Sequence, residues 1–211
     1  MDEFITTLKF IHRRIKPEIE KRLKEFKRNR TEEKMEKEFF FCLLTPQCKA
    51  RICWTNIEAL YSKGILQKGT EKEIAEYLYG IRFRNNKARY IVEAREKFFN
   101  GRGSIKKVID NSNDPLFLRQ YIVKNVKGMG WKEASHFLRN TGMGEELAIL
   151  DRHILRGLLK AKVIKKIPET LTGKTYIAIE DKMRKFAESI DIPLAHLDFV
   201  LWYFFNREVF K

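Results

Sequence analysis

The sequence has few residues that interrupt helices and strands or form disulfides, with 11 glycines, 5 prolines and 3 cysteines among 211 residues. The cysteines, Cys42, Cys48 and Cys53, are odd in number and lie in one apolar region. A disulfide framework and a four-cysteine iron–sulfur site are therefore excluded, and we expect buried, reduced thiols. With no repeat and no low-complexity segment, the chain has no obvious long linker.

The sequence also lacks an apolar run of membrane-spanning length and a secretory signal pattern at its N-terminus. We therefore expect a soluble, cytoplasmic protein with no membrane partner. The 4 histidines are scattered, and no dense carboxylate cluster accompanies them. This distribution argues against a metal-dependent nuclease and predicts no metal site.

Positive charge is abundant: lysine and arginine number 43 against 28 acidic residues, for a formal net charge of +15. A basic excess of this size favours a polyanionic partner. The excess that is not offset by nearby glutamate lies in segments 9–30, 82–89 and 160–166. These segments could line a groove, and a solvated surface is the alternative for each.

Apolar residues recur at helical spacing through nearly the whole chain. The pattern predicts helices near 2–28, 31–44, 48–62, 71–79, 85–99, 115–125, 131–141, 151–160, 175–190 and 194–207. Only the surroundings of Val163 and Ile164 resemble a strand. The simplest interpretation is one all-α unit over 1–211, built from two intimately packed lobes, 31–145 and 1–30 with 146–211.

The most specific local pattern is the segment 126–134, a tight turn between two helical runs. Gly128 and Gly130 can take positive φ and carry no Cβ, so the turn could press its amide groups against a phosphate oxygen. Such a grip reads the nucleic-acid backbone and not its sequence. An ordinary αα-hairpin with a glycine cap is the alternative.

Lys132 opens the helix after this turn, and Asp151 follows further along the chain. A glycine hairpin, a lysine and one downstream carboxylate together suggest a DNA-handling enzyme. Lys132 could instead be a solvent-facing lysine that contacts phosphate. Asp151 could cap the helix that begins at Arg152, and both roles of Asp151 are compatible.

With these residues the chain resembles the helix-hairpin-helix DNA glycosylase superfamily. Within it, the chain is similar to the second family of 8-oxoguanine DNA glycosylase/AP lyases, found mainly in archaea and some thermophilic bacteria. Besides the hairpin, the resemblance rests on segments 43–47, 81–88, 150–153 and 196–203 and on the ending at Lys211. The four-cysteine cluster typical of the endonuclease III branch is missing.

The resemblance implies a two-lobed glycosylase fold with the hairpin, 116–141, in a helical barrel. It also implies a bifunctional enzyme that flips 8-oxoguanine out of duplex DNA, excises it and nicks the strand. Lys132 matches the position of the Schiff-base nucleophile, and Asp151 that of the carboxylate that stabilises the sugar cation. Because an attacking amine must be neutral, we expect Lys132 to be partly desolvated at a helix N-terminus, close to other cations. No cofactor is required, a monovalent cation is implied at the hairpin carbonyls, and a monomer is expected.

For base recognition the resemblance points to Phe83, Asp198, Trp202 and Lys211. Asp198 and Trp202 are four residues apart and would share one helix face, where an aromatic ring can sandwich a purine and a carboxylate can accept its N–H groups. Core packing is the alternative for Trp202, and a loop anchor for Phe83. DNA contacts are expected from Gln47, Arg51, Lys127, Gly128 and Gly130.

The assignment of Gln47 and Arg51 is weakened because segment 45–51 departs from the related glycosylases' patterns. Gln47 could simply precede a helix. Two rival functions stay open at this point: a non-catalytic helix-hairpin-helix DNA-binding module, and a glycosylase for oxidised pyrimidines or mismatched adenine. The lysine–aspartate pair argues against the first, and the missing cysteine cluster with the aromatic and acidic tail argues against the second.

Overall fold

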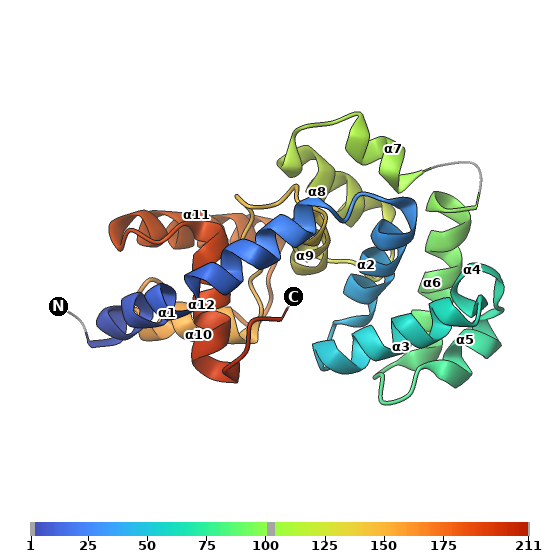
Figure 1. Ribbon diagram of the computed structural model, residues 1–211, viewed down its shortest axis with the longest axis horizontal. Helices are drawn as coiled ribbons and strands as arrows, with labels where there is room; N and C mark the ends of the chain where they lie inside the picture. The colour runs from blue at the N-terminus through green and yellow to red at the C-terminus, as the bar shows by residue number, and fades with distance from the viewer. Residues whose placement is uncertain (1–2, 101–103, 211) are drawn as a thin grey trace.

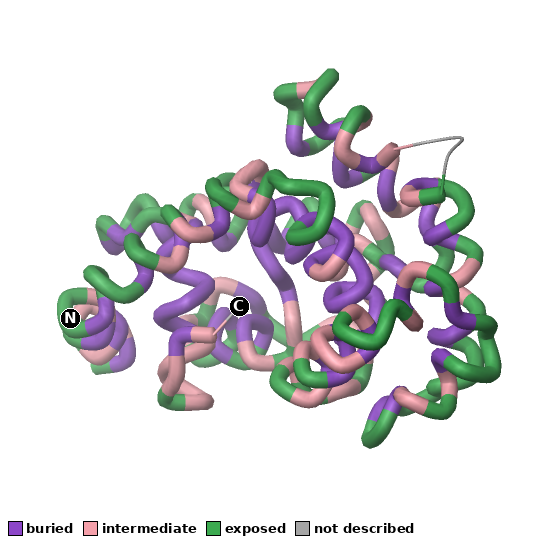
Figure 2. Tube along the Cα trace, turned by 45° about the vertical axis from the view of Figure 1, so that its right-hand side comes forward, coloured by how far each residue is buried: buried purple, intermediate pink, exposed green. Residues whose placement is uncertain are grey.

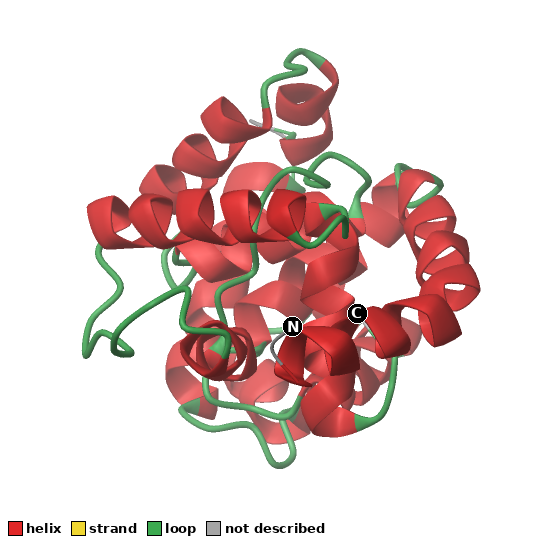
Figure 3. Cartoon of the chain, turned by 90° about the vertical axis from the view of Figure 1, so that its left-hand side faces the viewer, coloured by secondary structure: helices red, strands yellow, loops and turns green. Residues whose placement is uncertain are grey.

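The computed structural model describes residues 3–100 and 104–210, and within these it contains helices joined by loops and no strand (Figures 1 and 3). The helices of the described residues are α1 (Glu3–Lys27), α2 (Glu32–Leu44), α3 (Ala50–Ser62), α4 (Ile65–Lys68), α5 (Glu71–Tyr77), α6 (Arg84–Phe98), α7 (Ile105–Asp110), α8 (Pro115–Asn125), α9 (Trp131–Asn140), α10 (Arg152–Lys160), α11 (Gly173–Ser189) and α12 (Leu194–Asn206). No helix of the described part is long and apolar enough to cross a membrane.

Every predicted helix is present, with ends that differ by a few residues. Two further helices, α4 and α7, were not predicted because four and six residues are too few to show a helical period. The strand-like interpretation of Val163 and Ile164 is wrong. Both amide groups point back to the carbonyl of Leu158, at 2.9 and 3.4 Å, so these apolar residues close the end of α10. Ile164 is buried there, which explains its hydrophobicity without a sheet.

The buried apolar residues divide between two cores, and Figure 2 shows the buried positions along the chain. The first is formed by buried residues between Met35 and Leu147, and the second by residues between Phe4 and Phe26 together with residues between Ala148 and Val209. In Figure 1, α1, α10, α11 and α12 gather at one end and α2 to α7 at the other, with α8 and α9 between them. The exact boundaries of the two lobes stay a prediction, and each lobe corresponds to one of the two cores.

Helix α1 shows how the second core closes around the chain's first residues. Its buried side chains recur every three or four positions from Phe4 to Phe26, so they form one stripe. This stripe packs along α12, and the rings of Phe4 and Phe204 meet edge to face at 5.1 Å between centroids. The second lobe is therefore completed by two segments from opposite ends of the sequence.

Candidate active site

The hairpin lies between α8 and α9, and a tight fit at Gly128 fixes its turn. Asp114 caps α8 by accepting from the amides of Leu116 and Phe117. Gly128 has φ +89, and a Cβ there would lie 2.5 Å from the Tyr90 ring. Only glycine satisfies both conditions. The expectation of positive φ at Gly130 is wrong: its φ is −92, an extended backbone that caps α9.

Lys132 is the second residue of α9, and its amine is held between a hydroxyl and a carboxylate. The Nζ atom lies 3.0 Å from Thr45 Oγ1 and 3.5 Å from Glu133 Oε1. The side chain is 20% exposed at a helix N-terminus, but the charged group beside it is the Glu133 carboxylate and not the cation that the sequence led us to expect. An amine in this place is reachable by a substrate and still oriented by the protein.

Glu133 was not among the residues predicted for the site. Its carboxylate accepts the Gly130 amide at 3.2 Å and lies beside the Lys132 amine. One side chain thus links the hairpin turn to the amine. The signal was present in the sequence, because a glutamate at the third position of a helix commonly reaches back to the capping residue.

The loop after α2 brings Thr45 to Lys132, and a buried lysine holds that loop. Lys87 is 5% exposed and donates to the carbonyls of Leu44 at 2.7 Å and Pro46 at 2.8 Å. Lys87 lies in the basic segment 82–89, which from the sequence could line a groove. For this residue that interpretation is wrong, because its ammonium group faces the protein interior.

Asp151 is the N-cap of α10, as the sequence predicted. Its Oδ1 atom accepts the Ile154 amide at 2.8 Å. The four residues before it, 147–150, are buried, so the carboxylate emerges from the junction between the two cores. A capping bond leaves the second carboxylate oxygen free to face a substrate.

Asp198 and Trp202 share one face of α12, as their spacing predicted. Asp198 is 7% exposed and forms an ion pair with Arg139 of α9, while its Oδ1 atom has no protein partner. The Trp202 ring meets His153 edge to face at 5.1 Å, and its indole N–H also has no protein partner. Two unpartnered polar atoms on one helix face are the kind of group that a purine edge can satisfy.

Electrostatics link Asp198 to both expected catalytic residues. The pKa of the Asp198 carboxyl is raised to about 6, chiefly by burial; Arg139 opposes the rise, and the charge of Asp151 adds to it. The positive charge of Lys132 lowers the same pKa. Asp198 therefore lies within electrostatic reach of Asp151 and Lys132, although the three residues come from three helices.

The remaining predicted residues occupy different surroundings. Phe83 is the N-cap of α6, and its side chain is 54% exposed. Gln47 is also exposed and lies before the N-cap of α3. Both residues have a φ of +57. A positive φ is strained for such residues, and strain of this kind concentrates at functional sites. Lys127 lies 3.6 Å from Glu93. Lys211 lies outside the described residues.

Arg51 is engaged by the segment that follows α12. It forms an ion pair with Glu208, and its guanidinium lies 4.7 Å from the centroid of the Phe210 ring. Phe210 in turn packs against the first core. A role of Arg51 in contacting DNA stays a prediction. It would require the ion pair with Glu208 to break, or the guanidinium to bond Glu208 and DNA at the same time. Across the described ranges, no group of three histidine, cysteine or acidic side chains is placed to hold a metal ion.

Comparison with known proteins decides the family. The model of the 8-oxoguanine DNA glycosylase family matches residues 19–192. The chain belongs to this family. A relative in Fusobacterium nucleatum, named 8-oxoguanine DNA glycosylase/AP lyase, is 44% identical over 214 residues that cover 100% of this chain and 99% of that protein.

Solved structures of the family agree over the whole fold. The crystal structure of the 8-oxoguanine DNA glycosylase of Thermotoga maritima is 36% identical, covers 100% of both chains and superposes with a TM-score of 0.88. That of the Methanocaldococcus jannaschii 8-oxoguanine glycosylase/lyase, in complex with a 15mer DNA containing 8-oxoguanine, is 35% identical with a TM-score of 0.88 and covers 98% of this chain and 99% of its own. The resemblance, the all-α helix-hairpin-helix fold and the enzyme class expected from the sequence are confirmed.

Proposed function

We propose that this chain excises 8-oxoguanine from duplex DNA and then cleaves the strand at the abasic site by β-elimination. The observation that carries the proposal is the Lys132 amine, held by Thr45 and Glu133 at the start of α9 within a fold that matches its relatives from end to end. The basic excess of the chain supports a polyanionic substrate.

The first chemical step builds positive charge on the deoxyribose as the glycosidic bond breaks. The Asp151 carboxylate, which is held by the Ile154 amide, would stabilise that charge. The neutral Lys132 amine then forms a bond to C1′, and the base leaves with the glycosidic electron pair. Glu133, beside the amine, can take the proton that Lys132 must lose before it attacks.

The second step follows from the covalent bond itself. Loss of a proton from the attacking nitrogen and opening of the sugar ring give an imine, which acidifies the C2′ hydrogen. Removal of that hydrogen expels the 3′ phosphate, and water later releases Lys132. No cofactor takes part.

Base selection is assigned to α12. The free Oδ1 of Asp198 can accept a purine N–H, and guanine lacks the N7 hydrogen that 8-oxoguanine carries. An acceptor left unpaired by guanine rejects it by a few kcal/mol. The other proposed contacts to the damaged base come from Phe83, Trp202 and Lys211. Contacts to the opposite strand are proposed for Gln47 and Arg51.

A monovalent cation at the hairpin belongs to the same proposal. Backbone carbonyls are the ligands that such ions prefer, and the two carboxylates near the turn are already engaged, Glu133 by the Gly130 amide and Glu93 by Lys127. The ion would hold the turn against a phosphate and leave the chemistry to Lys132. We also propose that the protein acts as a monomer in the cytoplasm, where it meets the DNA of the cell.

Borohydride trapping tests the proposal directly. We expect a covalent adduct with a duplex carrying one 8-oxoguanine, none with the undamaged duplex, and none with Lys132→Gln, whose DNA binding stays largely intact. Tight, salt-dependent binding without an adduct on any lesion would point to a binding module. An adduct with an oxidised pyrimidine but not with 8-oxoguanine would point to a different base specificity.

A further inference from the structure

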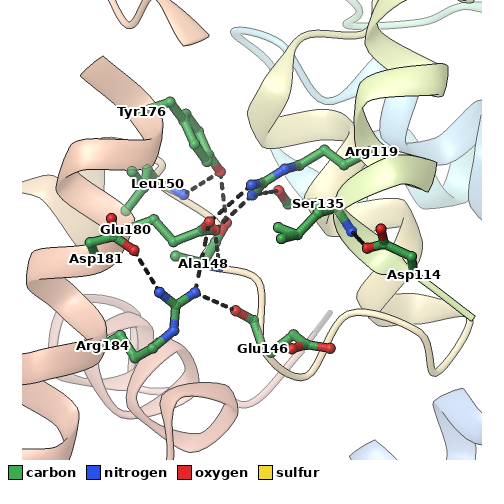
Figure 4. A network of polar contacts seen from close by, with 11 residues as sticks. Asp114, Arg119, Ser135, Glu146, Ala148, Leu150, Tyr176, Glu180, Asp181 and Arg184 are labelled. Atoms are coloured by element: carbon green, nitrogen blue, oxygen red, sulfur yellow. Dashed lines mark hydrogen bonds and ion pairs between the residues drawn. The ribbon is translucent and has the colours of Figure 1, made fainter. Parts of the chain in front are cut away.

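A buried polar network joins the two lobes away from the residues that carry the proposed chemistry (Figure 4). Arg119 of α8 donates two parallel hydrogen bonds to Glu180 of α11, with Nη1 to Oε2 at 2.7 Å and Nη2 to Oε1 at 2.9 Å. The side chains are 1% and 2% exposed. A charged pair removed so completely from water is tolerated only with well-placed partners, so its geometry is tightly constrained.

On one side the network fixes the segment that leads to Asp151. Glu180 accepts the Ala148 amide at 2.8 Å. The hydroxyl of Tyr176 donates to the Ala148 carbonyl at 2.7 Å and accepts the Leu150 amide at 3.1 Å. Two side chains of α11 thus hold three backbone groups of the segment directly before Asp151 (Figure 4).

On the other side the network holds the start of α9. Arg119 donates to Ser135 at 3.2 Å, and its guanidinium lies 5.1 Å from the centroid of the Trp131 ring. Trp131 is also pressed by α11, because a Cβ on Gly173 would lie 2.7 Å from the Trp131 ring. The residue after Trp131 is Lys132, so the same network constrains the backbone that carries the amine.

We propose that Arg119, Glu180 and Tyr176 form a positioning unit that sets the Asp151 carboxylate against the Lys132 amine. Lys132 belongs to the helix pair packed on the first core, and Asp151 begins a helix of the second. Their relative placement depends on how the lobes are docked, and this unit contacts the backbone on both sides of the junction. The inference rests on the proposed function, which assigns the chemistry to these two residues.

The experiment uses Glu180→Gln and Tyr176→Phe in the full chain. Glu180→Gln keeps the shape of the side chain but loses the charge that faces Arg119, and Tyr176→Phe removes only the hydroxyl. Single-turnover excision from an 8-oxoguanine duplex should fall by about 10–100-fold, the loss that a misplacement near 1 Å produces. The Kd for the same duplex should change little.

A second readout separates positioning from general loosening. Trapping on a duplex with a preformed abasic site requires the Lys132 amine but no longer the carboxylate that stabilises the sugar cation during base loss. Because Glu180 and Tyr176 bond the segment before Asp151, positioning predicts that in these two variants excision falls far more than abasic-site trapping. A purely structural role would slow both reactions by the same factor, and that result in Tyr176→Phe, the milder variant, would overturn the inference.

A third test variant is Arg119→Lys, which removes the paired hydrogen bonds to Glu180. Arg95→Lys is its matched control. Arg95 is also a buried arginine, but it donates to the carbonyls of Leu66 and Gly69 within the first lobe. Of the two arginine variants, only Arg119→Lys should lower excision more than trapping, and the same difference in Arg95→Lys would contradict the inference. Lys132→Gln is assayed alongside: a persistent adduct there defeats the proposed function. If Lys132→Gln forms no adduct while Glu180→Gln and Tyr176→Phe excise at the normal rate, the proposed function stands and only the positioning unit is refuted.

Discussion

Single side chains in this site owe their chemical state to what surrounds them. Asp198 is the clearest case, because burial raises its pKa to about 6 although a guanidinium faces it. Near neutral pH the carboxyl is ionised and can accept a purine N–H, whereas in mild acid it holds a proton. The proposed base contact is therefore linked to pH through one residue.

This linkage predicts a pH-dependent stability. The unperturbed carboxyl titrates near 3.8 and the folded one near 6. Between these values the folded protein holds more protons than the unfolded chain, so the contribution of Asp198 to the free energy of unfolding falls as pH rises. Asp198→Asn cannot ionise and should lack this fall. Urea unfolding of both proteins across this window checks it, and a difference that is constant with pH would contradict the raised pKa.

Asp151 is the N-cap of α10 and also the proposed catalytic carboxylate, and two substitutions can separate its effect on stability from its effect on excision. Asn caps a helix as well as Asp, so Asp151→Asn should melt near the wild-type temperature but lose excision, whereas Asp151→Ala should also lose about 1 kcal/mol of stability. Asp114→Asn, at the N-cap of α8, is the control and should leave excision intact. Thermal unfolding and single-turnover excision measure both effects. Normal excision by Asp151→Asn would refute the catalytic role.

Among the elements, the loop between α2 and α3 is held by a residue distant in sequence, Lys87. Lys87 bonds two of its carbonyls, and the sulfur of Cys48 lies 3.3 Å from the same ammonium. Lys87→Met would leave the Pro46 carbonyl without its partner and the Leu44 carbonyl with only the Cys53 thiol at 3.4 Å, at a cost of about 1–3 kcal/mol. We expect a lower melting temperature and slower trapping, because Thr45 would no longer be held beside Lys132.

Lys97→Met is the control for this prediction, since Lys97 lies on the same helix α6 and bonds Asn125 at the surface. It should change stability by less than about 0.5 kcal/mol. Equal effects of the two substitutions would show that the loop does not depend on Lys87.

The sequence was sufficient for the elements whose signal is local. Helical spacing predicted α1 and α12 and the shared face of Asp198 and Trp202, two residues that the resemblance had pointed to. The cap at Asp151 was suggested by an aspartate directly before a helical run. The burial of Lys87 could not be predicted, because its carbonyl partners lie 43 and 41 residues away and offer no charge pattern. The partner of Asp198 was equally hidden, since Arg139 is 59 residues distant in sequence.

At the scale of the whole molecule, α1 and α12 are joined by a histidine pair. His12 Nε2 and His196 Nδ1 lie 3.0 Å apart. Burial lowers the pKa of both rings below 6.5, and the positive charge of Lys16 lowers it further. As the pH falls below 6.5 the unfolded chain takes up protons that the folded pair resists, so the free energy of unfolding falls.

Replacing both histidines by glutamine should therefore reduce the loss of melting temperature between neutral and mildly acidic pH. Differential scanning calorimetry at the two pH values measures this loss. Its full persistence in the double variant would place the acid sensitivity elsewhere, for instance in other groups around α1.

The discontinuity of the second core has a consequence for synthesis on the ribosome. The fully buried residues of the first core have all emerged by residue 147, whereas the stripe of α1 from Phe4 to Phe26 meets its main partner only when α12 follows. At translation speeds of about 5–20 residues per second, the nascent chain presents this stripe to its surroundings for on the order of ten seconds. Nascent-chain binding factors and aggregation compete for α1 during that interval, although the finished protein buries it.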